Sequence, residues 1–321
     1  MGQLELRVSP ECWDEVWSAD PLATPFQSRP WMEAAEASGH YRDMSRFYDF
    51  GKGRAVVPLA AVSRRFRGER GMSMPHGMGA GGLIADFDPG PDDMRVILDD
   101  LKSLDLRGIA VRPNPLRSTC WEAAGAQGWT RVERCAHVLD LDGGYDAVWQ
   151  RMTSAKRNRI RKARASELVL ERGTGPDLVD RFYALYLRWS VVRARRRRLP
   201  SPLITLLARW REPKWKFDAT AERMGPALTV LMASHQGRPV AGAIYLEMGR
   251  SAVYWRGASD PDLTRDYPAN DLLQDEMIGA ACRAGCTHYH LGESGGVESL
   301  MRFKAQFGAR PVNYAEWVIG R

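Results

Sequence analysis

The sequence of 321 residues contains no apolar run approaching the roughly 20 residues needed to cross a bilayer. Its first residues, MGQLELRVSPECWDEVW, contain no basic stretch followed by an apolar one, so we expect no secretory signal. The five cysteines are odd in number and irregularly spaced, which argues against a disulfide framework and indicates a reducing compartment. We therefore expect a cytoplasmic protein without membrane insertion.

Several familiar kinds of site are also missing. The spacing of Cys282, Cys286, His288 and His290 fits no common zinc finger, so we expect no metal site. The glycine-rich segment 77–82, GMGAGG, lacks the Lys-Ser/Thr ending of a P-loop, and we interpret it as a mobile loop over a cleft.

Positive charge is concentrated in two tracts. Residues 151–164 contain seven Lys or Arg and no acid, and residues 181–198 contain another seven and no acid. The rest of the chain has 32 basic and 39 acidic residues, so it is acidic overall. Two basic tracts on an acidic body are typical of a protein with a polyanionic partner. The alternative is two well-solvated helix faces.

Strands that alternate with helices predict an α/β (α+β) protein of two domains with mixed sheets. The Gly/Asp break LDLDGGYD places the boundary after Gly143, giving domains 1–143 and 144–321, with the last strand free to pack on the first domain. Residues 51–62 (GKGRAVVPLAAV) and 235–246 (HQGRPVAGAIYL) share a pattern of turn, Gly-Arg and strand. This pattern indicates an internal duplication.

Four segments follow one another in a specific order: TPFQSRPWMEA (24–34), SAKRNRIRKA (154–163), VYWRGASD (253–260), and HLGESGG followed by LMRFKAQFGA (300–309). In this order the chain resembles the Fem family of aminoacyl-tRNA-dependent peptidyltransferases. The resemblance covers nearly the whole chain and is strongest in the second half. It implies two tandem GNAT-like domains, with the acyl-CoA N-acyltransferase fold. It also implies transfer of an aminoacyl group from a charged tRNA to an amine acceptor, with the tRNA as co-substrate and no further cofactor.

Two departures from the family pattern bear on the acceptor. Peptidoglycan-building members carry a Lys shortly after the Trp of the first motif, where this chain has Ala34 and Ala35. The long helical arm of some members also has no room here. Both weaken a cell-wall assignment and leave a smaller amine, for example in natural-product or antibiotic biosynthesis, as an acceptor.

Lys304 is the predicted catalytic residue. Attack of an amine on an aminoacyl ester makes a tetrahedral intermediate with oxyanion character, and a fixed cation lowers that barrier. Its neighbour Phe303 is predicted as a wall of the site. Tyr254 and Arg256 alternate along one strand, so we expect them to share a face that lines the acceptor channel, with Trp255 in the core.

The remaining substrate-binding predictions are Arg193, which falls where the family places an acceptor-contacting Arg, and His290, as a base or binding residue. Phosphate contacts with tRNA would supply salt-dependent affinity. The residues expected to make them are the basic side chains of the two tracts, namely Lys156, Arg157, Arg159, Arg161, Lys162, Arg195, Arg196, Arg197 and Arg198.

Two rival functions remain open at this point. A CoA-dependent N-acyltransferase would have a glycine-containing pyrophosphate turn, whereas the turn at 258–271, ASDPDLTRDYPAND, has two prolines and no glycine. A non-catalytic RNA-binding protein would use the basic tracts alone. The sequence names neither the amino acid carried, the acceptor, the general base nor the oligomeric state.

Overall fold

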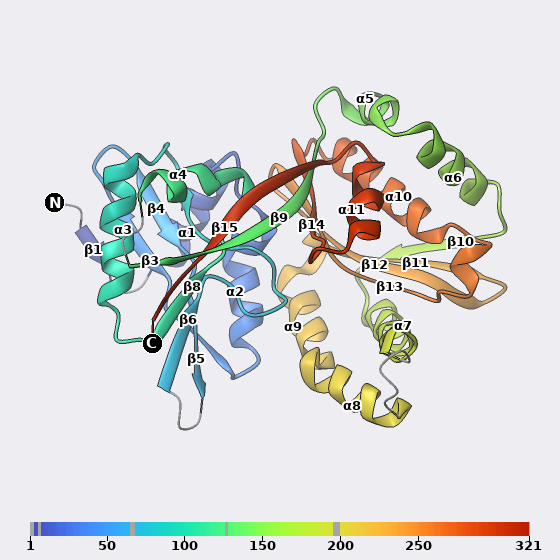
Figure 1. Ribbon diagram of the computed structural model, residues 1–321, viewed down its shortest axis with the longest axis horizontal. Helices are drawn as coiled ribbons and strands as arrows, with labels where there is room; N and C mark the ends of the chain where they lie inside the picture. The colour runs from blue at the N-terminus through green and yellow to red at the C-terminus, as the bar shows by residue number, and fades with distance from the viewer. Residues whose placement is uncertain (1–2, 6–7, 65–67, 126–127, 195–199, 321) are drawn as a thin grey trace.

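The computed structural model describes residues 3–5, 8–64, 68–125, 128–194 and 200–320, which form two lobes joined by long strands (Figure 1). The helices are α1 (Pro10–Ala19), α2 (Arg29–Glu36), α3 (Pro91–Ser103), α4 (Ser118–Ala123), α5 (Gly144–Arg151), α6 (Ser154–Arg164), α7 (Pro176–Ala194), α8 (Ser201–Arg211), α9 (Lys214–Met224), α10 (Ala269–Arg283) and α11 (Glu298–Ala305). Among the helices of this described part, none has the length and apolar character that crossing a bilayer requires.

The strands are β1 (Gln3–Glu5), β2 (Tyr41–Asp43), β3 (Arg46–Asp49), β4 (Arg54–Val57), β5 (Ala60–Arg64), β6 (Gly68–Met72), β7 (Ile84–Ala85), β8 (Gly108–Val111), β9 (Thr130–Asp140), β10 (Val169–Gly173), β11 (Leu228–His235), β12 (Arg238–Met248), β13 (Ser251–Ser259), β14 (His288–Glu293) and β15 (Arg310–Gly320). A small sheet has the order β1-β3-β4-β7. A second, mixed sheet of eleven strands has the order β10-β11-β12-β13-β14-β9-β15-β8-β6-β5-β2 and runs through both lobes.

The same unit is built twice along the chain. In the first half, the antiparallel strands β5 and β6 are followed by helix α3, and β8 then pairs parallel to β6. In the second half, β12 and β13 are followed by α10, and β14 pairs parallel to β13. A helix crossover between parallel strands is the connection that such strands require.

The two units exchange their last strands. Strand β9 follows the first unit but pairs antiparallel with β14 of the second, while β15 follows the second unit and pairs antiparallel with β8 of the first. The exchanged strands also pair with each other, from Arg310 opposite Val138 to Val318 opposite Thr130 (Figure 1). Backbone hydrogen bonds of β9 and β15, to each other and to strands of the opposite lobe, therefore join the two lobes.

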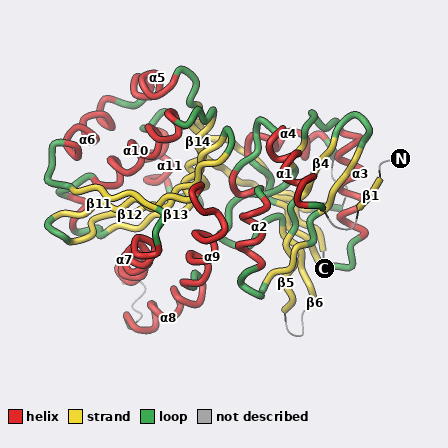
Figure 2. The backbone as a smooth tube through the Cα atoms, turned by 180° about the vertical axis from the view of Figure 1, so that it is seen from behind, coloured by secondary structure: helices red, strands yellow, loops and turns green. Residues whose placement is uncertain are grey.

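An apolar core also spans the two lobes. Trp31 of α2 is fully buried and meets Trp255 of β13 edge-on, with ring centroids 5.1 Å apart. The Phe217 ring of α9 lies 5.4 Å from the same Trp255 ring. Helices α2 and α9, which pack against each other (Figure 2), thus both contribute an aromatic side chain to the surroundings of Trp255. Because each fully buried large apolar side chain contributes about 1.5–3 kcal/mol, this cluster holds the lobes in a fixed relation.

Candidate functional site

The cleft lies where two parallel strands separate. Strand β13 pairs with β14 only from Ser251 opposite His288 to Val253 opposite His290, although β13 continues to Ser259. The space beyond this point is a cleft of about 690 Å³. It is lined by 253–259 and 290–293 of the second lobe and by Thr24, Phe26, Gly77, Gly79, Arg112 and Asn114 of the first.

Lys304 reaches the cleft from the last turn of α11 and is only 3% exposed. Its Nζ donates hydrogen bonds to the carbonyl oxygens of Gly292 and Glu293, both at 2.8 Å. An ammonium has three N–H groups, so one is left for a ligand. Burial lowers the pKa of Lys304 to about 8, with partial compensation from the nearby Glu293 carboxylate. The predicted catalytic lysine is therefore a buried, fixed cation at the cleft wall.

Phe303 also lines the cleft, and its ring is in contact with a second lysine. The Nζ of Lys156 lies 4.0 Å from the centre of the Phe303 ring and 4.3 Å from that of Phe307. Lys156 is 1% exposed and forms an ion pair with Asp271, in the first turn of α10. The prediction that Lys156 contacts tRNA phosphate is thus corrected, since its charge is neutralised inside the protein.

The other basic residues of α6 have mixed surroundings. Arg157 donates hydrogen bonds to the carbonyl oxygens of Trp149, Gln150 and Met152, and Arg159 pairs with Asp271 at 3.0 Å while remaining 54% exposed. Arg161 and Lys162 lie on the exposed face of the helix. Arg159, Arg161 and Lys162 therefore remain accessible, whereas Arg195, Arg196, Arg197 and Arg198 lie outside the described residues.

A β-bulge changes the expected arrangement of β13. Ile244 of β12 pairs with Arg256 and Tyr245 pairs with Tyr254, so Trp255 is an extra residue between them. Tyr254 consequently packs on one face of the sheet, whereas Trp255 packs on the other, with the core shared by the two lobes. The prediction that Tyr254 and Arg256 share a face is wrong, because the bulge shifts the alternation by one residue.

Both residues nevertheless line the cleft. A Cβ added at Gly257 would lie 1.8 Å from the hydroxyl oxygen of Tyr254. Only glycine at this position therefore permits the observed position of the Tyr254 ring. Desolvation raises the pKa of Tyr254 to about 12, which keeps the hydroxyl neutral. Arg256 donates hydrogen bonds to the Gly77 carbonyl and to Glu212 Oε1, and it thereby ties the second lobe to the glycine-rich loop of the first.

Arg193 and His290 differ in solvent exposure: Arg193 is exposed and His290 is buried. Arg193 is exposed near the end of α7, with its guanidinium 5.1 Å from the ring centre of Trp189, and both line the cleft. His290 is 5% exposed, and no hydrogen-bond partner for its Nε2 occurs among the described residues. Burial lowers the pKa of His290 to about 3, so the imidazole is neutral and a weak base. Of its two predicted roles, the site favours binding.

Sequence reasoning overlooked one carboxylate in the cleft. Glu293 follows Gly292 in the glycine turn and accepts a hydrogen bond from the Tyr314 hydroxyl at 2.7 Å. Arg112 and Arg134 lie 3.6 and 3.7 Å from its oxygens. The HLGESGG motif contains this residue, but its partners come from distant strands that no local pattern connects to it.

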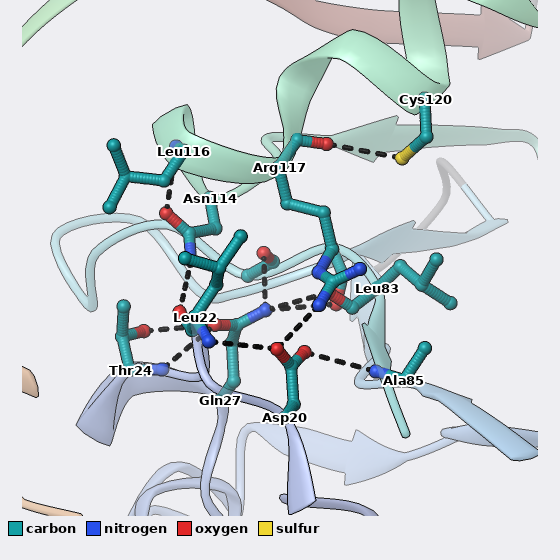
Figure 3. A network of polar contacts seen from close by, with 12 residues as sticks. Asp20, Leu22, Thr24, Gln27, Leu83, Ala85, Asn114, Leu116, Arg117 and Cys120 are labelled. Atoms are coloured by element: carbon teal, nitrogen blue, oxygen red, sulfur yellow. Dashed lines mark hydrogen bonds and ion pairs between the residues drawn. The ribbon is translucent and has the colours of Figure 1, made fainter. Parts of the chain in front are cut away.

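The first-lobe wall of the cleft is held by buried polar contacts (Figure 3). Asp20 pairs with Arg117 and accepts hydrogen bonds from the backbone N–H groups of Leu22 and Ala85, while Asn114 donates to the Leu22 carbonyl at 2.6 Å. The fully buried Gln27 donates to the carbonyls of Gly81 and Leu83 and accepts from Thr24. Because Thr24 and Asn114 line the cleft, this network fixes its shape.

The start of α10 offers little to a diphosphate. The N–H of Ala269 donates to the Tyr267 carbonyl at 2.7 Å, and that of Asp271 donates to the Pro268 carbonyl at 3.1 Å. The buried Asp271 carboxylate in this turn is already paired with Lys156 and Arg159. Within the described part of the chain, no group of three or more His, Cys, Asp or Glu side chains could hold a metal ion.

Comparisons with known proteins identify the fold. Residues 150–305 match the family model described as an acetyltransferase (GNAT) domain. The chain aligns with the crystal structure of FemX at a TM-score of 0.74 and 11% identity, over 99% of this chain and 97% of that one. No curated protein sequence matches.

Two further structures share the architecture. L-PGS from Bacillus licheniformis aligns at a TM-score of 0.54 and 11% identity, covering 98% of this chain and 92% of that one. A tandem GNAT protein from the clavulanic acid biosynthesis pathway aligns at 0.51 and 12% identity, covering 98% of each chain. The predicted Fem-like tandem GNAT fold is confirmed. At these sequence identities the likeness establishes the fold. The donor and the acceptor have to be inferred from the residues of the cleft.

Proposed function

We propose that the protein is an aminoacyltransferase that moves an aminoacyl group from a charged tRNA to an amine acceptor and forms an amide bond. The observation that carries the proposal is Lys304, a cation buried to 97% at the wall of a large cleft, with two carbonyl oxygens holding its Nζ. Burial of a lysine without a directly paired carboxylate is costly, and ionisable groups in such surroundings cluster at functional sites. The use proposed for this charge is stabilisation of an oxyanion.

The reaction follows from this geometry. The acceptor nitrogen attacks the ester carbonyl carbon of the donor, and the carbonyl oxygen gains negative charge near Lys304. The bond from this carbon to the ribose oxygen then breaks, and the proton lost by the nitrogen goes to that oxygen. Because the ester is already activated, neither ATP nor a metal ion is required, and the protein contributes positioning and charge stabilisation.

The charge of the cleft supports an anionic donor. Among the described residues, the charged side chains that line the cleft are the cations Arg112, Arg193, Arg256 and Lys304 and the carboxylate Glu293. The positive excess suits a phosphate-bearing end of tRNA, and Glu293 suits the ammonium of an amine acceptor. The accessible cations of α6 would contact the tRNA further along its backbone.

The first turn of α10 disfavours the CoA-dependent alternative, because the N–H groups of Ala269 and Asp271 already donate to backbone carbonyls and are not free for a pyrophosphate. The function is tested by incubating the protein with a mixture of charged tRNAs and an extract of its host, followed by mass spectrometry. We expect a new aminoacylated amide that depends on charged tRNA. An amide formed with acetyl-CoA and without tRNA would contradict the proposal.

A further inference from the structure

Helix α8 presents an apolar stripe to solvent. Leu203, Leu206, Leu207 and Trp210 are 42, 64, 47 and 82% exposed, and their spacing of three, four and seven residues puts them on one face. A surface helix normally turns such a stripe inward, yet α8 buries only Ile204. Of the ten large apolar side chains that are exposed among the described residues, four are on this one helix. The stripe is therefore a patch and not scattered surface residues.

Strong positive charge accompanies this stripe. Residues 193–211 contain seven arginines and no acidic residue. Within the described part of this segment, Arg193, Arg209 and Arg211 are all exposed. The helix lies at the outer edge of the second lobe, beside α7 and α9 (Figures 1 and 2). Among the described residues, none buries its apolar stripe.

We propose that α8 is a docking surface for an anionic lipid bilayer, which the protein would bind peripherally. Leucine and tryptophan side chains favour the boundary between headgroups and acyl chains, and arginines on the same element attract anionic headgroups. The inference rests on the exposure and charge of this helix and goes beyond the proposed function.

The charge and the apolar character of this surface favour an anionic bilayer over a second copy of the chain and over a nucleic acid. A second copy docked by a two-fold axis would bring two arginine-rich segments together without an acid between them. A nucleic acid would satisfy the arginines but would leave the leucines beside phosphates. An anionic bilayer satisfies both parts of the surface at once.

The position of α8 gives the docking a consequence. A groove of about 580 Å³ lies beside the helix, lined by Leu207, Arg211 and Trp189 among others, and it shares Gly77, Arg193 and Arg256 with the cleft. Docking would therefore bring the mouth of the cleft close to the membrane surface.

The test is co-sedimentation of the full chain with vesicles of phosphatidylcholine, with and without phosphatidylglycerol. We expect binding to the anionic vesicles alone, weakened by salt. The Leu206→Gln/Trp210→Gln variant keeps the charge, and we expect its binding to weaken by at least about tenfold because two exposed apolar anchors are lost. The matched control, Val96→Gln/Val169→Gln, removes apolar residues of similar exposure elsewhere and should bind like the parent.

The inference would be overturned if the protein did not bind anionic vesicles, or if the Leu206→Gln/Trp210→Gln variant bound them as well as the parent does. A stable dimer that this variant dissociates would overturn it too. Loss of tRNA binding by the variant with vesicle binding retained would also assign the surface to nucleic acid and contradict the proposal. Aminoacyl transfer to a water-soluble acceptor should be unchanged in the variant, so failure of the membrane inference is distinguishable from failure of the proposed function.

Discussion

The two halves of the chain build the same strand–helix–strand–helix unit, but the last helices of these units end differently. Glu122 is the penultimate residue of α4, is exposed, and pairs with Arg131 at 3.1 Å. Lys304 is the penultimate residue of α11, is buried, and points its ammonium at the cleft. The shared fold alone therefore does not supply the proposed catalytic cation, which only the second half has at this position.

The crossover helices differ in a similar way. Asp93 is the third residue of α3, where it accepts a hydrogen bond from the Gly90 N–H and pairs with Lys52, which is 59% exposed. Asp271 is the third residue of α10, where it pairs with the fully buried Lys156. The same position caps a helix in one half and neutralises a buried charge behind the cleft in the other.

The largest expected effect concerns this second pair. Asp271→Ala leaves the Lys156 ammonium buried without a carboxylate, and we expect a loss of about 3–5 kcal/mol in the free energy of unfolding. Asp93→Ala should cost about 1 kcal/mol, because its lysine partner can turn to water. Urea unfolding of both variants measures the difference.

A double variant sharpens that comparison. Lys156→Met/Asp271→Leu removes both charges and should recover most of the stability lost by Asp271→Ala. Equal destabilisation by Asp93→Ala and Asp271→Ala would show that the two helix starts are equivalent after all.

The next effect concerns the two penultimate residues. Lys304→Ala should lower the rate of aminoacyl transfer by about 10²–10³-fold, as removal of an oxyanion-stabilising group does, while tRNA affinity changes little. Glu122→Ala, at the matching position of the first half, should leave both unchanged. Single-turnover transfer and filter-binding measurements on the same preparations give the two quantities. Unchanged transfer by Lys304→Ala would show that Lys304 is not the group that stabilises the oxyanion.

A smaller effect concerns the contribution of the first half to the cleft. Gly79 has φ +87°, and a Cβ there would lie 2.2 Å from the Phe26 ring. Gly39 has φ +68° with nothing within 4 Å. Both alanine variants suffer backbone strain, but Gly79→Ala should lose about 1–3 kcal/mol more because of overpacking. Thermal unfolding of the two variants measures both losses of stability. Equal losses would mean that the Phe26 ring can move away from a Cβ at position 79 without a free-energy penalty.

Local patterns in the sequence predicted the alternation of strands with helices and singled out Lys304, which the structure places at the cleft wall. The glycine turn, the short helix and its Phe-Lys pair are adjacent in the chain, so their arrangement depends on few distant contacts. The prediction of a loop over the cleft at 77–82 agrees with the position of Gly77 and Gly79 in the cleft lining.

Arrangements that depend on pairing between distant segments could not be predicted in this way. The exchange of β9 and β15 joins residues more than a hundred positions apart, and the bulge at Trp255 is fixed by the register with β12. The burial of Lys156 did leave a signal, because it precedes Ile160 and Ala163 by four and seven residues and therefore lies on the one buried face of α6. Because lysine is charged, its residue type predicted an exposed position for Lys156.

The central claim is that the charge of Lys304 promotes the reaction, and the pH dependence of single-turnover transfer tests it most directly. Because burial lowers the pKa of Lys304 to about 8, its ammonium is present below that pH and is lost above it. Transfer should therefore decline by about tenfold per pH unit above pH 8. The decline should be absent in Lys304→Arg, whose guanidinium stays charged, even if that variant is slower. A wild-type rate that keeps rising through pH 9, or the same decline in Lys304→Arg, would contradict the account.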